Sequence, residues 1–145
     1  MSAGIETDLQ AIPCMPMRGG TPRGPFFLES DLPSDITARN RVLLAAIGSP
    51  DPPQIDGLGG THPLTSKVGI VRPSKVEGVD LDFLFAQLRR ALGAVDTTPN
   101  CGYMFAAVLP FALEPGLIAP CGNTTTARSE SLEDFLRTRR VPESA

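Results

Sequence analysis

The chain has 145 residues, of which 41% are hydrophobic and 20% are charged, and its formal net charge is −3. Such a length fits one domain with a real apolar core, and such a composition is typical of globular proteins. The small negative charge gives no general attraction to nucleic acid or to anionic lipid, so we expect neither as a partner. The 14 glycines and 15 prolines indicate many turns and argue against a helical bundle.

The first ten residues are interpreted as a polar leader, and a strand is expected over residues 11–17. That strand runs into Arg18-Gly-Gly-Thr-Pro-Arg-Gly24, and the Phe-Phe-Leu run at residues 26–28 returns as a second strand. The glycines favour either a hairpin or a nest of backbone N–H groups that binds an anion. In the nest, Arg18 pairs with a carboxylate and the N–H groups bind its other oxygen; in a plain turn, the arginine is solvated.

A helix is predicted next, because Ile36, Leu43, Leu44 and Ile47 fall at helical spacing behind a Pro-Ser-Asp run, and Gly48 follows as a stop signal. The glycine-rich segment over residues 54–62 is unsuited to regular structure. We expect a loop pressed close to a neighbour, with a ligand as one candidate. The segment has neither the Gly-Lys-Ser/Thr ending of a Walker loop nor a GxGxxG pattern, so nucleotide binding is not indicated.

A strand is expected over residues 64–71, with Val68 and Ile70 on one face and Lys67, Gly69 and Val71 on the other. Lys67 is a candidate base or anion partner if it is partly desolvated, whereas a strand lysine in general faces water. Periodicity does not distinguish a strand from a helix over residues 79–92.

An apolar helix is predicted over residues 101–113, with Cys101 in its first turn after Pro99 and Asn100. Unpaired N–H groups and the helix dipole favour a thiolate at that position, which makes Cys101 a candidate acid or base. The alternative is a buried core thiol, because the residues that follow are apolar.

The tail, residues 121–145, is expected to hold a loop over residues 121–131. A short helix is then predicted on the apolar side chains of Leu132, Phe135 and Leu136. Acidic residues come early in that segment and arginines late, as the helix dipole favours.

The cysteines predict no metal site, because none is part of a CxxC pair: Cys14, Cys101 and Cys121. The single histidine, His62, cannot complete a conventional zinc set with them. We therefore expect reduced thiols, with Cys14 as a small core residue. Glu6 and Asp8 precede any apolar run, unlike the basic start of a secretory signal, and no apolar stretch reaches the ~20 residues that a bilayer requires. A cytoplasmic location is expected.

Five motifs follow one another along the chain: Ile12-Pro-Cys-Met-Pro-Met-Arg-Gly-Gly-Thr21, Gly48-Ser-Pro-Asp51, Gln54-Ile-Asp-Gly-Leu-Gly-Gly60, Pro63-Leu-Thr-Ser-Lys-Val68 and Pro99-Asn-Cys-Gly102. In order and approximate spacing they resemble the PrpF family, over residues 11–117. Within the family, the residues of these motifs are most similar to those of the 4-oxalomesaconate tautomerases. The chain has Cys101-Gly102-Tyr103 where the family usually has Cys-Gly-Asn.

The resemblance implies an α+β lobe of the diaminopimelate epimerase type, with a mixed curved sheet around a central helix that begins near Cys101. We expect this lobe over residues 11–120, without the family's second lobe. On the same ground, residues 79–92 are assigned to a strand at their start. No cofactor is expected.

The resemblance also implies roles for individual residues. Lys67 and Cys101 match the family's proposed acid/base pair, and substrate carboxylates are assigned to Arg18, Thr21, Gly59, Gly60 and Ser66. A 1,3-proton shift beside conjugated carbonyl and carboxylate groups needs one group to remove a proton, another to return it, and donors for the dienolate charge.

The function that we expect is therefore a cofactor-independent isomerase acting on a small unsaturated polycarboxylate, with 4-oxalomesaconate tautomerisation ahead of 2-methylaconitate isomerisation. The alternative is a truncated, non-catalytic lobe that binds carboxylates or associates with a partner. An isolated lobe exposes the surface that normally meets its mate, so either a homodimer or a separate second lobe is expected to cover it.

Overall fold

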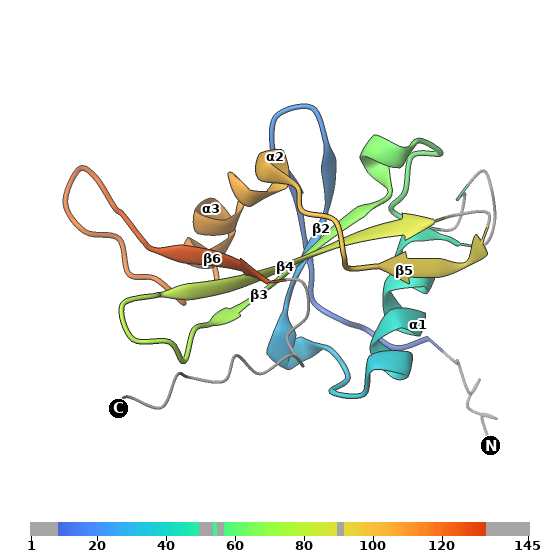
Figure 1. The fold of residues 1–145 in the computed structure, drawn as a ribbon, viewed down its shortest axis with the longest axis horizontal. Helices are drawn as coiled ribbons and strands as arrows, with labels where there is room; N and C mark the ends of the chain where they lie inside the picture. Colours follow the sequence, from blue (N-terminus) through green and yellow to red (C-terminus); the bar gives the residue numbers. More distant parts are fainter. Residues whose placement is uncertain (1–8, 50–53, 55–56, 90–91, 133–145) are drawn as a thin grey trace, which may run out of the picture.

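A computed structural model describes residues 9–49, 54, 57–89 and 92–132. These residues form a mixed six-stranded sheet with helices on both of its faces (Figure 1). Five strands follow in the order β1-β2-β3-β4-β5, and β6 pairs with β4. The expected α+β fold class with a mixed sheet is confirmed. No helix in the described part of the chain is long and apolar enough to cross a membrane.

The sheet begins with the expected hairpin. Strands β1 (Met15–Arg18) and β2 (Arg23–Leu28) pair antiparallel, with Arg18 opposite Arg23. Gly20 at the tip has a φ of 67°, which glycine adopts without a steric penalty. The first strand is Met15–Arg18 and not residues 11–17, because in this register residues 11 and 12 would lie opposite the 3-10 turn Glu29–Asp31 that follows β2.

The predicted first helix is confirmed as α1 (Ile36–Ile47). The Asp35 carboxylate accepts a 2.8 Å hydrogen bond from the Ala38 N–H, and Gly48 ends the helix in the left-handed conformation at φ 88°. A single 3-10 turn, η1 (Glu29–Asp31), connects β2 to this helix. Both ends of α1 thus follow from local capping chemistry.

Strand β3 (Lys67–Pro73) lies parallel to β2 and antiparallel to β4 (Leu81–Arg89). The strand was expected from residue 64, but Pro63–Thr65 forms the 3-10 turn η2, which begins with a proline and is capped by His62. The segment that fitted both periodicities is a strand in β4. It is buried on both faces of the sheet, so tertiary burial decides between the two patterns.

Two strands share the remaining edge of β4. Strand β5 (Ala94–Asp96) pairs antiparallel with its end, and β6 (Ser129–Leu132) pairs parallel with its start. The loop predicted over residues 121–131 is therefore wrong at its end. A pairing with residues almost 50 positions away creates β6, and no local pattern signals it. Leu132 belongs to this strand and not to a helix, while Phe135 and Leu136 lie outside the described residues.

The single apolar helix predicted over residues 101–113 is also corrected. The structure has two short helices, α2 (Gly102–Phe105) and α3 (Val108–Leu113), separated by a turn. Pro110 lacks the N–H that a continuous helix would donate to the carbonyl of Ala106, so the helix restarts with Pro110 in its first turn.

The sheet separates two apolar clusters, which give its faces their names. On the α2–α3 face, Phe26, Val71, Phe83 and Phe85 pack with residues of α2 and α3. On the α1 face, the buried residues of the sheet and of α1 are Phe27, Val68, Ile70, Leu84, Ala86, Leu88, Leu43 and Ile47. The expected alternation along β3 is confirmed, because Val68 and Ile70 share the α1 face and Val71 lies on the other.

Candidate functional site

Lys67 begins β3, and its side chain lies on the α2–α3 face. Its ammonium donates a 2.9 Å hydrogen bond to Oε1 of Gln87, the residue opposite it in β4, and lies 4.9 Å from the centre of the Phe85 ring. The residue is half-buried. At Gly24 in β2, a Cβ atom would lie 1.8 Å from the Lys67 carbonyl oxygen, so the neighbouring strand can approach only without a side chain. The Lys67 ammonium is thus partly desolvated and is held in place by Gln87 and Phe85.

Gln87 was not predicted from the sequence. Its amide nitrogen donates to the carbonyl oxygens of Pro63 (3.1 Å) and Ser66 (3.0 Å), while its amide oxygen faces Lys67. The only available signal was weak: in the alternation Leu81, Phe83, Phe85, Gln87, the fourth member is polar.

Cys101 precedes the first turn of α2 as its N-cap residue, instead of lying within the turn, and is half-buried. Its N–H donates to Oδ1 of Asn100 (2.8 Å), which also accepts a 2.9 Å hydrogen bond from the Ser131 hydroxyl in β6. The Cys101 side chain packs against the apolar cluster of the α2–α3 face. The start of α2 is therefore tied to the strand that sequence reasoning missed.

Lys67 and Cys101 lie on the same face of the sheet. The aromatic ring under the Lys67 ammonium, Phe85, belongs to the cluster against which Cys101 packs. An amine and a thiol beside one apolar surface are suited to moving protons, because partial exclusion of water strengthens their interaction with a bound anion.

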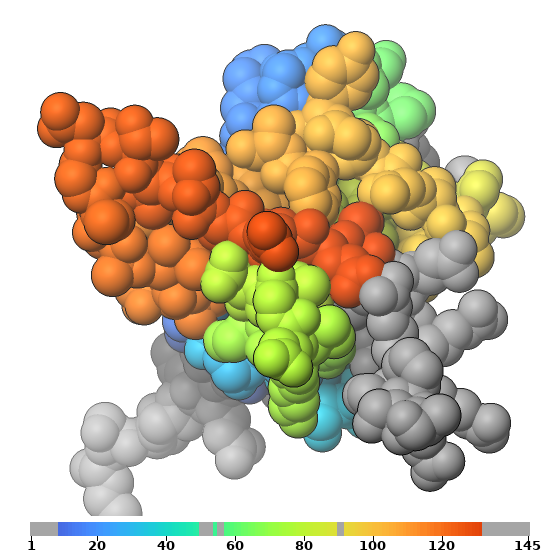
Figure 2. Space-filling model, turned by 60° about the vertical axis from the view of Figure 1, so that its left-hand side comes forward, coloured from blue at the N-terminus to red at the C-terminus, as the bar shows by residue number. Residues whose placement is uncertain are grey.

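The tip of the β1–β2 hairpin docks on the start of α2. A Cβ atom on Gly19 would lie 2.0 Å from the carbonyl oxygen of Tyr103, and one on Gly20 would lie 3.0 Å from the Tyr103 ring. Figures 1 and 2 show the blue hairpin, the orange segment after Cys101 and the green segment before β3 at one end of the molecule. Thr21 is exposed at this tip.

Arg18 is placed differently. Met15 and Met17 in β1 pack on the α2–α3 face, so the alternation of the strand directs Arg18 to the α1 face. There it lines a hollow of about 260 Å³ together with Arg23 and Leu58. The structure thus brings Thr21 toward the Cys101 segment but directs Arg18 to the other face from Lys67.

The glycine loop and Ser66 are held by internal hydrogen bonds. The N–H of Gly59 donates to the Ile47 carbonyl (3.2 Å), and the N–H of Gly60 donates to the Thr65 hydroxyl (3.1 Å). Ser66 is buried, and its hydroxyl donates to the His62 carbonyl (3.1 Å). These predicted substrate ligands use their donors within the protein in this structure.

The buried Gln54 side chain forms hydrogen bonds to that loop and to Ser66. The residue has a left-handed backbone at φ 51°, its amide oxygen accepts from the Thr61 N–H (2.9 Å), and its amide nitrogen donates to the Ser66 hydroxyl (3.3 Å). A Cβ atom on Gly59 would lie 2.3 Å from the Gln54 amide oxygen, so this glycine is required for packing.

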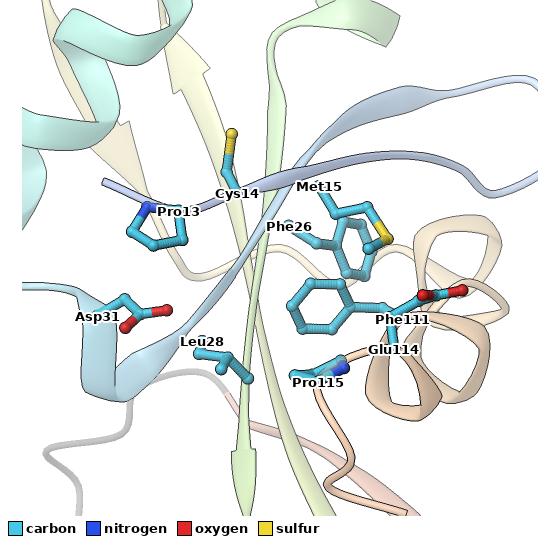
Figure 3. Close-up of a pocket in the computed structure, with 9 residues that line it drawn as sticks. All are labelled: Pro13, Cys14, Met15, Phe26, Leu28, Asp31, Phe111, Glu114 and Pro115. Carbon is cyan, nitrogen blue, oxygen red and sulfur yellow. The ribbon is translucent and has the colours of Figure 1, made fainter. Parts of the chain in front are cut away.

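An apolar cavity of about 300 Å³ lies elsewhere, between β1, β2 and the end of α3 (Figure 3). The Phe26 and Phe111 rings form its floor, with Asp31 and Glu114 among its lining residues. None of the predicted site residues lines it, and its two carboxylates would repel a polycarboxylate.

Cys14 borders this cavity and is exposed, which corrects the expected core position. Residue 14 comes before the first residue of β1, outside the paired ladder, so the sheet does not enclose it. Neighbouring atoms still desolvate the sulfur, and this burial raises the pKa of the Cys14 thiol. In the described part of the chain, no three His, Cys, Asp or Glu residues are arranged to hold a metal ion.

The family of PrpF proteins matches residues 9–131, most of the chain. The chain belongs to the PrpF family. The (4E)-oxalomesaconate Δ-isomerase of Novosphingobium sp. (strain KA1) is 50% identical over 120 residues, which are 83% of this chain and 34% of that protein. The 4-oxalomesaconate tautomerase of Pseudomonas putida is 53% identical over 117 residues, which are 81% of this chain and 32% of that protein.

A crystal structure of a methylitaconate-δ-isomerase has the same fold, with a TM-score of 0.81 and 41% sequence identity over 84% of this chain. This chain covers 32% of that protein. This PrpF chain thus spans about a third of the length of the relatives that it matches.

Proposed function

We propose that this chain carries the proton-transfer residues of a cofactor-independent isomerase that acts on an unsaturated polycarboxylate. The first candidate reaction is the tautomerisation of 4-oxalomesaconate, because two relatives about half identical to the chain bear oxalomesaconate names. The observation that carries the proposal is the common face of Lys67 and Cys101, an amine and a thiol beside the Phe85 cluster.

In the proposed reaction, one of these two side chains removes an allylic proton and the other returns a proton at the far end of the conjugated system. The dienolate that forms between the two steps gains negative charge, which the Lys67 ammonium stabilises electrostatically. Thr21 at the hairpin tip is proposed to bind a substrate carboxylate. Gly59, Gly60 and Ser66 are proposed to do the same once their donors leave the internal acceptors Ile47 O, Thr65 Oγ1 and His62 O. Arg18 is proposed to attract the anion from the other face of the sheet.

Proton exchange in deuterated water tests the proposal directly. Purified protein is incubated with 4-oxalomesaconate, and NMR follows the loss of the allylic proton signal. We expect the wild-type protein to exchange the proton faster than the protein-free solution. The exchange rate of the protein should fall by at least about a hundredfold in Cys101→Ser. It should be unchanged in Cys121→Ser, a change at an exposed thiol. Exchange that is equal in both variants would remove the Cys101 thiol from the mechanism.

Substrate choice is tested by the same method with other acids. The resemblance also allows 2-methylaconitate isomerisation, and the structural relative is named for methylitaconate. The acid that is consumed fastest identifies the reaction. We expect 4-oxalomesaconate to be consumed faster than 2-methylaconitate and methylitaconate.

A non-catalytic association lobe is the second candidate. It is favoured by the internal hydrogen bonds that occupy Gly59, Gly60 and Ser66. We propose that either a second copy or a separate chain with the rest of the fold covers the exposed side chains of Tyr103 and Leu92. Sedimentation velocity measures this association, and a monomer at every concentration would contradict the homodimer.

We also propose that the protein acts in the cytoplasm. The three cysteines are free thiols in the structure, which fits a reducing compartment. Fractionation of cells that produce the tagged chain tests the location, and recovery in the periplasmic or membrane fraction would contradict it.

A further inference from the structure

Gln87 has an amide group whose orientation is determined by its surroundings. Two carbonyl oxygens, those of Pro63 and Ser66, lie at 3.1 and 3.0 Å from its nitrogen. Carbonyl oxygens only accept hydrogen bonds, so a flipped amide would place its oxygen against both of them. The flip would also turn the NH2 group toward the Lys67 ammonium, which only donates. The amide oxygen must therefore face Lys67.

The Lys67 ammonium is held from two directions. Gln87 accepts its hydrogen bond at 2.9 Å, and the face of the Phe85 ring lies 4.9 Å away. A hydrogen bond to an amide oxygen and a contact with a ring face are both interactions that an ammonium makes, and both lie on the α2–α3 face. Within the described residues, no carboxylate is within ion-pair distance of this ammonium. A neutral partner holds the cation without cancelling its charge.

We propose that Gln87 is a positioning residue, which fixes the Lys67 ammonium over Phe85 on the face where Cys101 lies. This inference rests on the proposed function, because Gln87 affects the reaction only through the proposed role of Lys67. The carbonyl oxygens of Pro63 and Ser66 orient the Gln87 amide, and this amide in turn holds the Lys67 ammonium in place for an anionic substrate. Preorganisation of this kind avoids reorganisation when charge develops in the reaction.

The chain offers a matched pair of probes, because Lys67 and the exposed Lys75 are its two lysines. NMR of labelled lysine ammonium groups resolves the two signals, and Lys75→Arg assigns them. In the wild-type protein we expect the Lys67 ammonium protons to exchange with water about tenfold more slowly than those of Lys75, since the hydrogen bond that the charged ammonium donates to Gln87 must open first. Equal exchange rates would overturn the proposal.

The variant Gln87→Met keeps the length of the side chain and removes both the acceptor and the two amide hydrogen bonds. We expect it to raise the Lys67 exchange rate to that of Lys75, whereas Gln10→Met, a change at an exposed glutamine, leaves the difference intact. A folded Gln87→Met protein with slow Lys67 exchange would contradict the assignment. If the variant unfolds by circular dichroism, the wild-type comparison still decides.

Turnover separates this inference from the proposed function. With 4-oxalomesaconate, Gln87→Met is expected to lower kcat by about tenfold with little change in KM, because the cation is displaced while the rest of the site remains. An inactive wild-type chain with a slowly exchanging Lys67 would refute the proposed function and support the positioning. An active chain whose Lys67 exchanges as fast as Lys75 would refute the positioning alone.

Discussion

Gly69 shows how a single missing side chain shapes the core. In β3 it lies beneath the Phe26 ring, and a Cβ atom there would lie 2.8 Å from three ring atoms. Phe26 is fully buried and contacts the rings of Phe83 and Phe111 at centroid distances of 5.9 and 5.5 Å. A side chain at residue 69 would therefore have to push the Phe26 ring out of its contacts with these two rings.

We predict that Gly69→Ala lowers the free energy of unfolding by about 1–3 kcal/mol, the usual cost of overpacking a core. Gly102→Ala is the matched control, because a Cβ atom there has no neighbour within 4 Å and the residue begins a helix. Urea unfolding measures both variants. Equal stability of Gly69→Ala and the wild-type protein would show that Phe26 is not confined.

Asp96 provides a pH-dependent contribution to stability. Hydrogen bonds from the side chain of Thr98, then from Arg89, and then from the Thr98 N–H lower the pKa of its carboxyl from 3.8 to about 2. Since the folded-state pKa is below the ordinary one, the contribution is complete above pH 4 and is lost as the pH falls through about 2.

Asp96→Asn is therefore expected to be less stable than the wild-type protein near neutral pH, and the difference should shrink as the pH falls from about 4 to about 2. Urea unfolding over that pH range measures it. Thr98→Val removes the largest cause and should show part of the same pH dependence. A difference that is independent of pH would contradict the assigned cause.

At the scale of elements, capping residues determine where α1 begins and ends. We predict that Asp35→Ala lowers the free energy of unfolding by about 1 kcal/mol, because the Ala38 N–H loses its acceptor. Ser34→Ala, one residue earlier and exposed, is the control and should have little effect. Thermal unfolding compares the two variants, and equal midpoints would show that water replaces the cap.

Local signals predicted α1 and the hairpin because their chemistry lies within a few residues. They could not predict the break between α2 and α3, where the missing N–H of Pro110 competes with an apolar run. For β4, periodicity fitted both helix and strand, and only burial on both faces decides. Elements whose partners are distant in sequence need the tertiary structure.

At the scale of the whole molecule, β6 pairs with the start of β4 and becomes an edge strand of the sheet there. The Arg128 carbonyl accepts from the N–H groups of Asp80 (2.8 Å) and Leu81 (3.1 Å), and the Asp80 carboxylate accepts from the Arg128 N–H (2.8 Å). The strand that follows covers the start of β4, where Leu81, Phe83 and Leu84 are fully buried.

We predict that a chain ending at Pro120 loses at least about 2 kcal/mol of unfolding free energy, since several backbone groups and apolar side chains become exposed. An unpaired strand edge also favours aggregation. Urea unfolding and light scattering measure both effects against the full chain. An unchanged urea midpoint would show that β6 contributes little to the sheet.

In the candidate site too, some features follow from the local sequence and others depend on long-range pairing. Local sequence signals identify the chemistry of the residues: a lysine and a cysteine in recognisable motifs, the β1–β2 hairpin, and α1 with its caps. The placement of the side chains comes from tertiary contacts: Lys67 and Cys101 share one face, Arg18 lies on the other, and Gln87 accepts a hydrogen bond from the lysine. Strand alternation and cross-strand register assign each of these side chains to a face. That register depends on pairings between segments far apart in the chain.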